Sequence, residues 1–202
     1  TAPAGFVDNS DDCDRHDDTP MSVSGLATFA PVGSPAPFNR EWPEGISVIP
    51  STNGGPGSPV VAFAPLGRYV KIAPDGSYTD YATFLNPLLA ATQRTVCSVV
   101  DAEGEIGPAG NMYVCLGDFQ DDPAARTGRY PGIYVVPPGG GEAVPFSLPS
   151  NIQIPEMITI VDHKLWVAAS IGAIYTVDSK GAVSLWSNDP LLAGNVPGAP
   201  RF

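Results

Sequence analysis

The hydrophobic positions of this chain fall into short runs that predict β-strands and no long helix. From Phe38 onward the runs are a few residues long, rich in β-branched and aromatic residues, and closed by Asp-Gly, Gly-Gly or Lys-Gly turns. The 23 prolines and 22 glycines fit many short elements joined by tight turns. The pattern therefore predicts an all-β domain over residues 38–202.

One strand–turn–strand pattern occurs three times in this domain. Upstream of each copy lies another pair of apolar runs, so each copy belongs to a unit of four strands. Repeats of four short antiparallel strands with recurring aromatic residues are typical of β-propeller blades, and a β-sandwich is the structural alternative. The units span about residues 40–86, 93–148 and 154–188, and their second halves are Gly67–Ala82, Gly132–Phe146 and Gly172–Trp186.

Three segments carry a resemblance to a known group of proteins. They are Pro43–Ile46 (PEGI), Gly67–Gly76 (GRYVKIAPDG) and, above all, Leu165–Asp178 (LWVAASIGAIYTVD). This wording resembles the senescence-marker-protein/gluconolactonase and NHL-repeat β-propellers of the strictosidine-synthase-like superfamily. The likeness covers residues 40–202 and is specific for the fold rather than for a reaction.

The resemblance implies a closed ring of six blades, of which this chain supplies about three. A half-ring leaves two blade faces open and exposes apolar surface that a closed domain covers. We therefore expect a partner to complete the ring: the other half of a longer chain, a second copy or another protein. A smaller, irregular β fold is the alternative.

Charged residues precede the first strand of each predicted blade. These strands line the channel of a propeller, so such residues face one another around its axis. Two carboxylates suit Ca²⁺, Mg²⁺ or Mn²⁺, and an arginine beside them can hold an anionic substrate group. Solvated strand ends or a structural ion cluster are the alternatives. The residues are Glu44, Arg94 and Glu156, with Trp42 as a candidate ligand contact.

In the lactonases that the sequence resembles, a divalent metal sits at the channel mouth, held by a glutamate of the first blade with Asn and Asp from later blades. Glu44 matches the first of these positions. Glu156 stands where an Asn is expected, which is a departure from the lactonase pattern. The chemistry implied is polarisation of a lactone carbonyl by the metal, with metal-bound water as nucleophile.

Residues 1–37 differ from the rest of the chain. They hold a dense acidic stretch, Asp8–Asp18, followed by a segment rich in Pro, Ser, Gly and Ala. Closely spaced carboxylates such as Asp11, Asp12 and Asp14 can wrap a Ca²⁺ ion, although the stretch lacks the glycine and glutamate of an EF-hand loop. The pattern favours a solvated acidic tail.

Two of the three cysteines flank a predicted hairpin loop. If the hairpin is centred near Ile106, Cys97 and Cys115 lie directly opposite each other on neighbouring strands, close enough for a disulfide. Two buried thiols are the alternative. The aromatic residues that recur from unit to unit are expected to pack within and between blades; they are Tyr69, Tyr134, Tyr175, Trp166 and Trp186.

The charge balance argues against two classes of partner. With 21 acidic and 10 basic residues the formal charge is −11, which repels nucleic acid and anionic membrane surfaces. The start of the chain has no charged and apolar segments of a signal peptide, so we expect such a signal to be removed or absent. Few lysines, few charges and many prolines favour an extracellular or periplasmic protein.

The sequence leaves two functions open. The first is a binding or assembly module whose open blade faces join another chain. The second is a lactonase-like hydrolase that depends on a divalent cation, with Ca²⁺ as the expected ion, and is active when the ring is complete.

Overall fold

The described part of the chain is built almost wholly of β-strands. The computed structural model describes residues 42–51, 57–64, 67–73, 77–84, 93–118, 130–147, 152 and 154–193.

These residues include thirteen strands and one 3₁₀ helix. They are β1 (Trp42–Ile49), β2 (Ser58–Ala64), β3 (Arg68–Ile72), β4 (Tyr78–Thr83), β5 (Gln93–Asp101), β6 (Asn111–Asp118), β7 (Gly132–Val136), β8 (Gly141–Glu142), β9 (Val144–Pro145), β10 (Pro155–Val161), β11 (Lys164–Ala169), β12 (Ala173–Val177), β13 (Val183–Ser187) and η3 (Pro190–Ala193).

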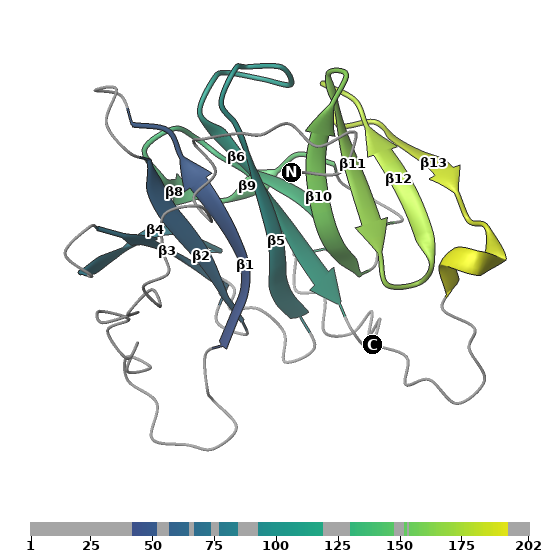
Figure 1. The fold of residues 1–202 in the computed structure, drawn as a ribbon, viewed down its shortest axis with the longest axis horizontal. Helices are drawn as coiled ribbons and strands as arrows, with labels where there is room; N and C mark the ends of the chain where they lie inside the picture. Colours follow the sequence, from purple (N-terminus) through teal and green to yellow (C-terminus); the bar gives the residue numbers. More distant parts are fainter. Residues whose placement is uncertain are drawn as a thin grey trace, which may run out of the picture. The chain divides into compact units, whose positions relative to one another are not determined.

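The strands form three sheets that follow one another along the chain (Figure 1). The first contains β1 to β4 in order, with β8 added beside β4; the second is β5-β6-β7-β9 and the third is β10 to β13 in order. Except for β8, consecutive strands of each sheet pair antiparallel. The predicted partial β-propeller of three blades is therefore confirmed, and we call the sheets the first, second and third blades.

Each blade has a β-bulge at the same place in its innermost strand. The bulge sets two residues of the inner strand opposite one residue of the next, so it fixes which residues of the three blades are equivalent. Glu44, Val96 and Glu156 are one such set. The interruptions lie between Pro43 and Gly45, between Thr95 and Ser98, and between Pro155 and Met157.

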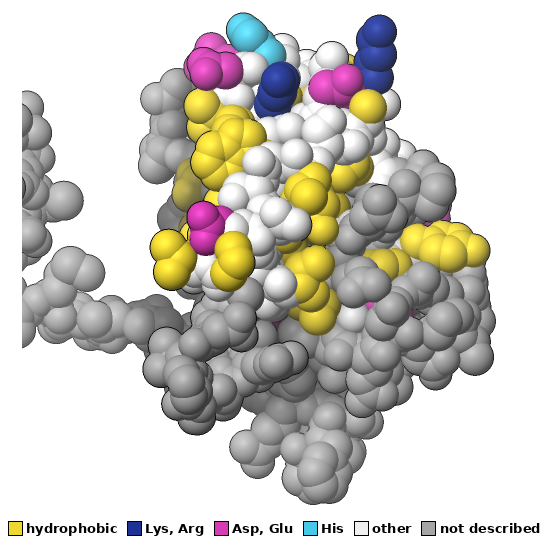
Figure 2. All heavy atoms as spheres, turned by 90° about the vertical axis from the view of Figure 1, so that its right-hand side faces the viewer, with side chains coloured by type: hydrophobic (Ala, Val, Ile, Leu, Met, Phe, Trp, Pro, Cys, Tyr) yellow, Lys and Arg dark blue, Asp and Glu magenta, His cyan; other side chains and the backbone are white. Residues whose placement is uncertain are grey.

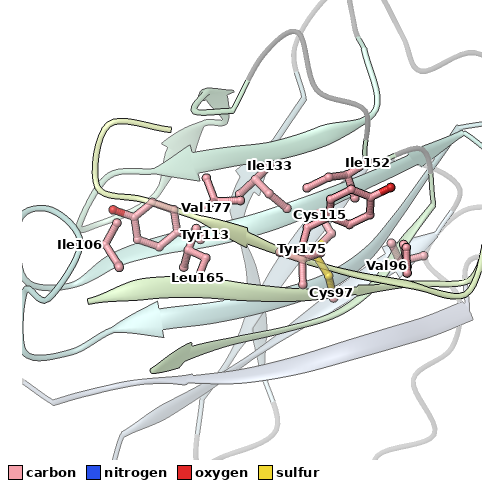
Figure 3. Packing of buried hydrophobic residues seen from close by; sticks show 13 residues of the cluster. Val96, Cys97, Ile106, Tyr113, Cys115, Ile133, Ile152, Leu165, Tyr175 and Val177 are labelled. Atoms are coloured by element: carbon pink, nitrogen blue, oxygen red, sulfur yellow. A yellow bond between two sulfur atoms is a disulfide. The ribbon is translucent and has the colours of Figure 1, made fainter. Parts of the chain in front are cut away.

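Two apolar layers join the blades. The inner strand β5 contacts β1 on one side and β10 on the other, as neighbouring blades do in a propeller. The layer between the first and second blades includes Val60, Tyr69, Tyr81, Met112 and Val114. The layer between the second and third blades, drawn in Figure 3, includes Tyr113, Ile133, Leu165, Val167 and Tyr175.

The β5–β6 hairpin has the register that the sequence predicts. The pairs Asp101–Asn111 and Ser98–Val114 centre it on Ile106. Next along the hairpin, farther from its turn, are Cys97 and Cys115. They form a disulfide with a Cα–Cα distance of 4.9 Å, which is drawn in Figure 3. The bond therefore ties the two innermost strands of the second blade together at the bulge.

Some sequence predictions fall outside this part of the chain. The acidic tail 1–37, with Asp11, Asp12 and Asp14, is not among the described residues. Within those residues, no helix has the length and apolar character needed to cross a membrane.

Candidate functional site

Glu44 and Glu156 occupy the bulge position of β1 and β10. A bulged residue has no partner in the strand pairing, so its side chain can be directed away from the regular alternation of the strand. Both glutamates follow a proline, at Pro43 and Pro155. The sequence thus repeats the same local structure in the first and third blades.

The two carboxyl groups influence each other electrostatically. Burial raises the pKa of Glu156, a hydrogen bond with Ser170 lowers it in part, and the negative charge of Glu44 raises it further. Glu156 is half-buried whereas Glu44 is exposed. Residues 112 positions apart in sequence are therefore brought close enough to repel, and we call them the carboxylate pair.

A half-buried carboxyl group with a raised pKa beside a second carboxyl group has two chemical uses. It can hold a proton and donate it to a ligand, or both groups can bind a cation that relieves their repulsion. Both uses require a ligand to reach the pair, which the exposure of Glu44 allows.

The bulge positions show that Arg94 is not the residue of the second blade that corresponds to Glu44 and Glu156. That alignment placed Arg94 with the two glutamates, but the register places Val96 there and pairs Arg94, two residues earlier, with Gly117 of β6. Val96 is buried. The side chains of Arg94 and Trp42 lie outside the described part of the structure.

The described residues do not provide a complete metal site. Among them, no group of three or more His, Cys, Asp or Glu side chains is arranged to hold an ion. The carboxylate pair supplies two donor groups, whereas Ca²⁺ takes six to eight oxygen ligands. Further ligands would have to come from water, from the rest of the chain or from a partner.

A second feature is the outer face of the third blade, the face turned away from the second blade. Strand alternation places Met157, Val161, Trp166, Ile174 and Trp186 on this face, which we call the outer face. Met157 is 70% exposed and Trp186 is 60% exposed. Figure 2, seen from this side, shows hydrophobic side chains running down the sheet below a charged end.

The outer face repeats an aromatic pair that is covered elsewhere in the protein. Trp166 and Trp186 meet edge-on with ring centroids 5.2 Å apart. Their equivalents in the second blade, Tyr113 and Phe146, meet in the same way at 4.8 Å. The third blade packs over the Tyr113–Phe146 pair. The outer face of the third blade is therefore equivalent to the face of the second blade that packs against the third blade.

The indole nitrogen of Trp166 is a polar atom without a hydrogen bond on this face. Nε1 is buried and has no partner among the described residues. A buried N–H group without an acceptor costs about 1–3 kcal/mol. An acceptor brought by a covering surface would remove this penalty.

The sequence matches no protein-family model and no curated protein. Solved structures similar to this chain include a protein of unknown function from Bacteroides caccae, with 13% identity, a TM-score of 0.41 and coverage of 71% of this chain and 44% of the other. Another is virginiamycin B lyase from Staphylococcus aureus, with 16% identity, a TM-score of 0.38 and coverage of 74% and 57%.

A gluconolactonase from Xanthomonas campestris is also similar, with 12% identity, a TM-score of 0.30 and coverage of 63% of this chain and 57% of the other. The chain thus spans about half the length of the solved structures it matches. At these identities and TM-scores the similarity does not extend to an activity.

Sequence reasoning treated the outer-face tryptophans as packing residues between blades. The recurrence of aromatic residues at equivalent positions carried that signal. It did not show that one of the three equivalent surfaces lies open, because the apolar alternation of a strand is the same whether or not a neighbour covers it.

Proposed function

We propose that this chain is an assembly module of a β-propeller, and that the outer face of the third blade binds a further blade. The observation that supports this most directly is the repeated aromatic pair. Tyr113 and Phe146 lie under a neighbouring blade, whereas no described blade covers Trp166 and Trp186, which have the same positions and edge-on geometry, and Trp186 is 60% exposed.

Burial of this face would stabilise an assembly appreciably. Large side chains that are more than half exposed, such as Met157 and Trp186, each contribute about 1–2 kcal/mol when the exposed part is covered. In the first and second blades, the face equivalent to the outer face packs against the next blade.

The test of this proposal measures whether the outer face is open in the isolated chain and closed in an assembly. Acrylamide quenching of Trp186 is obtained from the difference between the wild-type chain and Trp186→Phe. We expect strong quenching in a dilute solution of the chain, and weaker quenching when two full chains are joined by a long flexible linker, which raises their effective concentration.

Leu185→Phe serves as the matched control, because Leu185 is exposed on the same strand but pairs with Tyr175 and lies on the opposite face. It should leave the quenching unchanged. If Trp186 is already protected in dilute solution, the chain covers the face by itself and the proposed function is wrong.

The carboxylate pair favours a second candidate, the lactonase-like hydrolase. The raised pKa of Glu156 beside Glu44 supports a site that binds a divalent cation such as Ca²⁺, with further ligands from the completed ring. Such a cation would polarise a lactone carbonyl. The chain itself would supply the two carboxylates and the Ser170 hydrogen bond that orients one of them.

Calorimetric titration with Ca²⁺ tests this candidate without an assay of activity. Glu44→Gln and Glu156→Gln should each weaken binding at least tenfold, and Glu103→Gln, at an exposed position of the β5–β6 loop, should have no effect. Equal binding by all four proteins would place the cation elsewhere and remove the carboxylate pair as its site.

The proposed location of this protein is outside the cytoplasm. The Cys97–Cys115 disulfide supports it, because such bonds persist in the oxidising environments of secreted and periplasmic proteins. Mass spectrometry of the natural protein with and without alkylation would test it: free thiols at both cysteines would contradict the proposal.

A further inference from the structure

The first blade exposes the counterpart of the outer face. On β1, Ile46 is 66% exposed and Val48 is 57% exposed. Their equivalents on β10, Ile158 and Ile160, pack in the apolar layer between the second and third blades. The exposed side of the first blade is thus equivalent to the side of the third blade that covers the aromatic pair of the second blade.

We infer that a second copy of this chain supplies the missing blades, with the first blade of each copy packed on the outer face of the other. This inference rests on the proposed assembly function and adds the identity of the partner. Three blades from each copy would complete the ring of six that the sequence resemblance implies. Head-to-tail contacts of this kind form closed rings when the rotation returns to its start.

The polar pair on the first blade is compatible with this packing. Arg68 and Asp80 form an ion pair, with Nη2 and Oδ1 2.6 Å apart. The equivalent of Asp80 in the third blade is Leu185, which stays 53% exposed at the existing junction. The equivalent of Arg68 is Ala173, which is buried at the existing junction, so the dimer requires the Asp80 carboxylate, which stays in water, to hold the Arg68 guanidinium toward the rim.

Charge opposes the association of two copies. Each chain carries a formal charge of −11, so two copies repel at low ionic strength. Salt screens this repulsion and leaves the apolar contact intact. Dimerisation should therefore strengthen as salt rises from 20 mM to 500 mM, the opposite of an assembly held by ion pairs.

The first experiment is sedimentation equilibrium of the full chain over a wide range of concentration. We expect a mass that rises from the 21.0 kDa monomer to twice that value and no further. Trp186→Glu on the outer face and Ile46→Glu on β1 should each abolish the rise. Both positions are exposed, so neither change is expected to unfold the chain, and circular dichroism checks this.

Mixing the two variants gives the sharpest test of the geometry. One Trp186→Glu chain keeps an intact first blade, and one Ile46→Glu chain keeps an intact outer face. An equimolar mixture therefore has one undamaged junction and should form heterodimers, although neither variant dimerises alone. Leu185→Glu, on the same strand as Trp186, should behave like the wild-type chain.

Other outcomes overturn the inference in recognisable ways. A dimer lost only with Trp186→Glu joins two outer faces, and one lost only with Ile46→Glu joins two first blades; both contradict the head-to-tail ring. A chain that stays monomeric at every concentration with Trp186 open to quencher contradicts the second copy as partner but leaves the assembly function standing. A monomer with Trp186 protected contradicts both.

Discussion

The side-chain oxygens of Ser47 and Ser98 lie 2.7 Å apart and form a hydrogen bond between β1 of the first blade and β5 of the second. Ser47 is buried, so the bond lies inside the junction, a few residues from the bulges. It links the strand that carries Glu44 to the strand that carries Val96. The relative position of these inner strands therefore depends partly on one polar contact.

We expect Ser47→Ala to lower the free energy of unfolding by about 1 kcal/mol, because the partner hydroxyl then loses its bond within the junction. Urea unfolding followed by fluorescence measures the change. Ser184→Ala, at an exposed position of β13, is the control. If Ser47→Ala and Ser98→Ala have fully additive effects, the two hydroxyls do not interact.

Removal of the Cys97–Cys115 bond should destabilise the second blade. The bond closes a loop with a sequence separation of 18, and a crosslink of this size contributes about 3 kcal/mol by restricting the unfolded chain. The double variant Cys97→Ala/Cys115→Ala should therefore unfold at lower urea concentration. A reducing agent should shift the wild-type chain in the same direction and leave the variant unchanged; equal shifts in both proteins would contradict this role.

Asp101 should control the conformation of the β5–β6 loop. Its buried carboxylate accepts hydrogen bonds from the backbone N–H groups of Glu105 at 2.7 Å, Ile106 at 2.9 Å and Gly107 at 3.0 Å. We expect Asp101→Ala to cost about 3 kcal/mol, because these donors lose their acceptor.

Hydrogen exchange of the amides of residues 105–107 gives a direct readout for the Asp101 variant. They should exchange much faster in Asp101→Ala and at an intermediate rate in Asp101→Asn, which keeps one acceptor oxygen. Exchange at the wild-type rate in Asp101→Ala would mean that the loop is held by other contacts.

The carboxylate pair predicts a pH dependence of stability. The pKa of Glu156 is raised in the folded protein by burial and then by Glu44, so the folded state binds its proton more tightly than the unfolded state does. Stability contributed by this group is complete below the ordinary glutamate pKa and is lost as the pH rises from there through the raised value. Glu156→Gln should remove this loss.

Carbon-13 NMR titration of the Glu156 carboxyl group tests the cause of the shift. Glu44→Gln removes one negative charge and should lower the pKa of Glu156, although not to the ordinary value, because burial is the larger cause. An unchanged titration in Glu44→Gln would show that the two carboxyl groups do not interact.

The sequence predicts the blade organisation well because the strand pattern repeats with its turns. The β5–β6 register follows from symmetry about Ile106, which needs no knowledge of the other blades. The proximity of Glu44 and Glu156 follows from a shared context, since each follows a proline near the beginning of an inner strand.

The register of Arg94 in β5 could not be predicted from the pattern of apolar residues. Its alignment matched the apolar Val96 with Ile46 and Ile158, whereas the pairing of β5 places the polar Ser98 at that position. Val96 and Cys97 are both apolar enough to be taken for regular strand residues. The bulge became visible only through the pairing partners of β5.

The strand β8 has a consequence for handling the isolated chain. It lies in the turn between β7 and β9 of the second blade, and it pairs in parallel with the free edge of β4, through Ala82 and Gly141. Gly140, at φ 93°, allows this close approach to the Tyr81 carbonyl, and Gly181 makes the corresponding contact with Phe146.

Each following blade thus shields the last strand of the one before it. Among the described residues, β13 has a strand on one side only. An unshielded strand edge can template the addition of extended segments from other molecules. A chain kept monomeric by Ile46→Glu leaves β13 unshielded and should therefore tend, when concentrated, toward fibrillar precipitation that starts at Val183–Ser187, whereas the ring dimer should not.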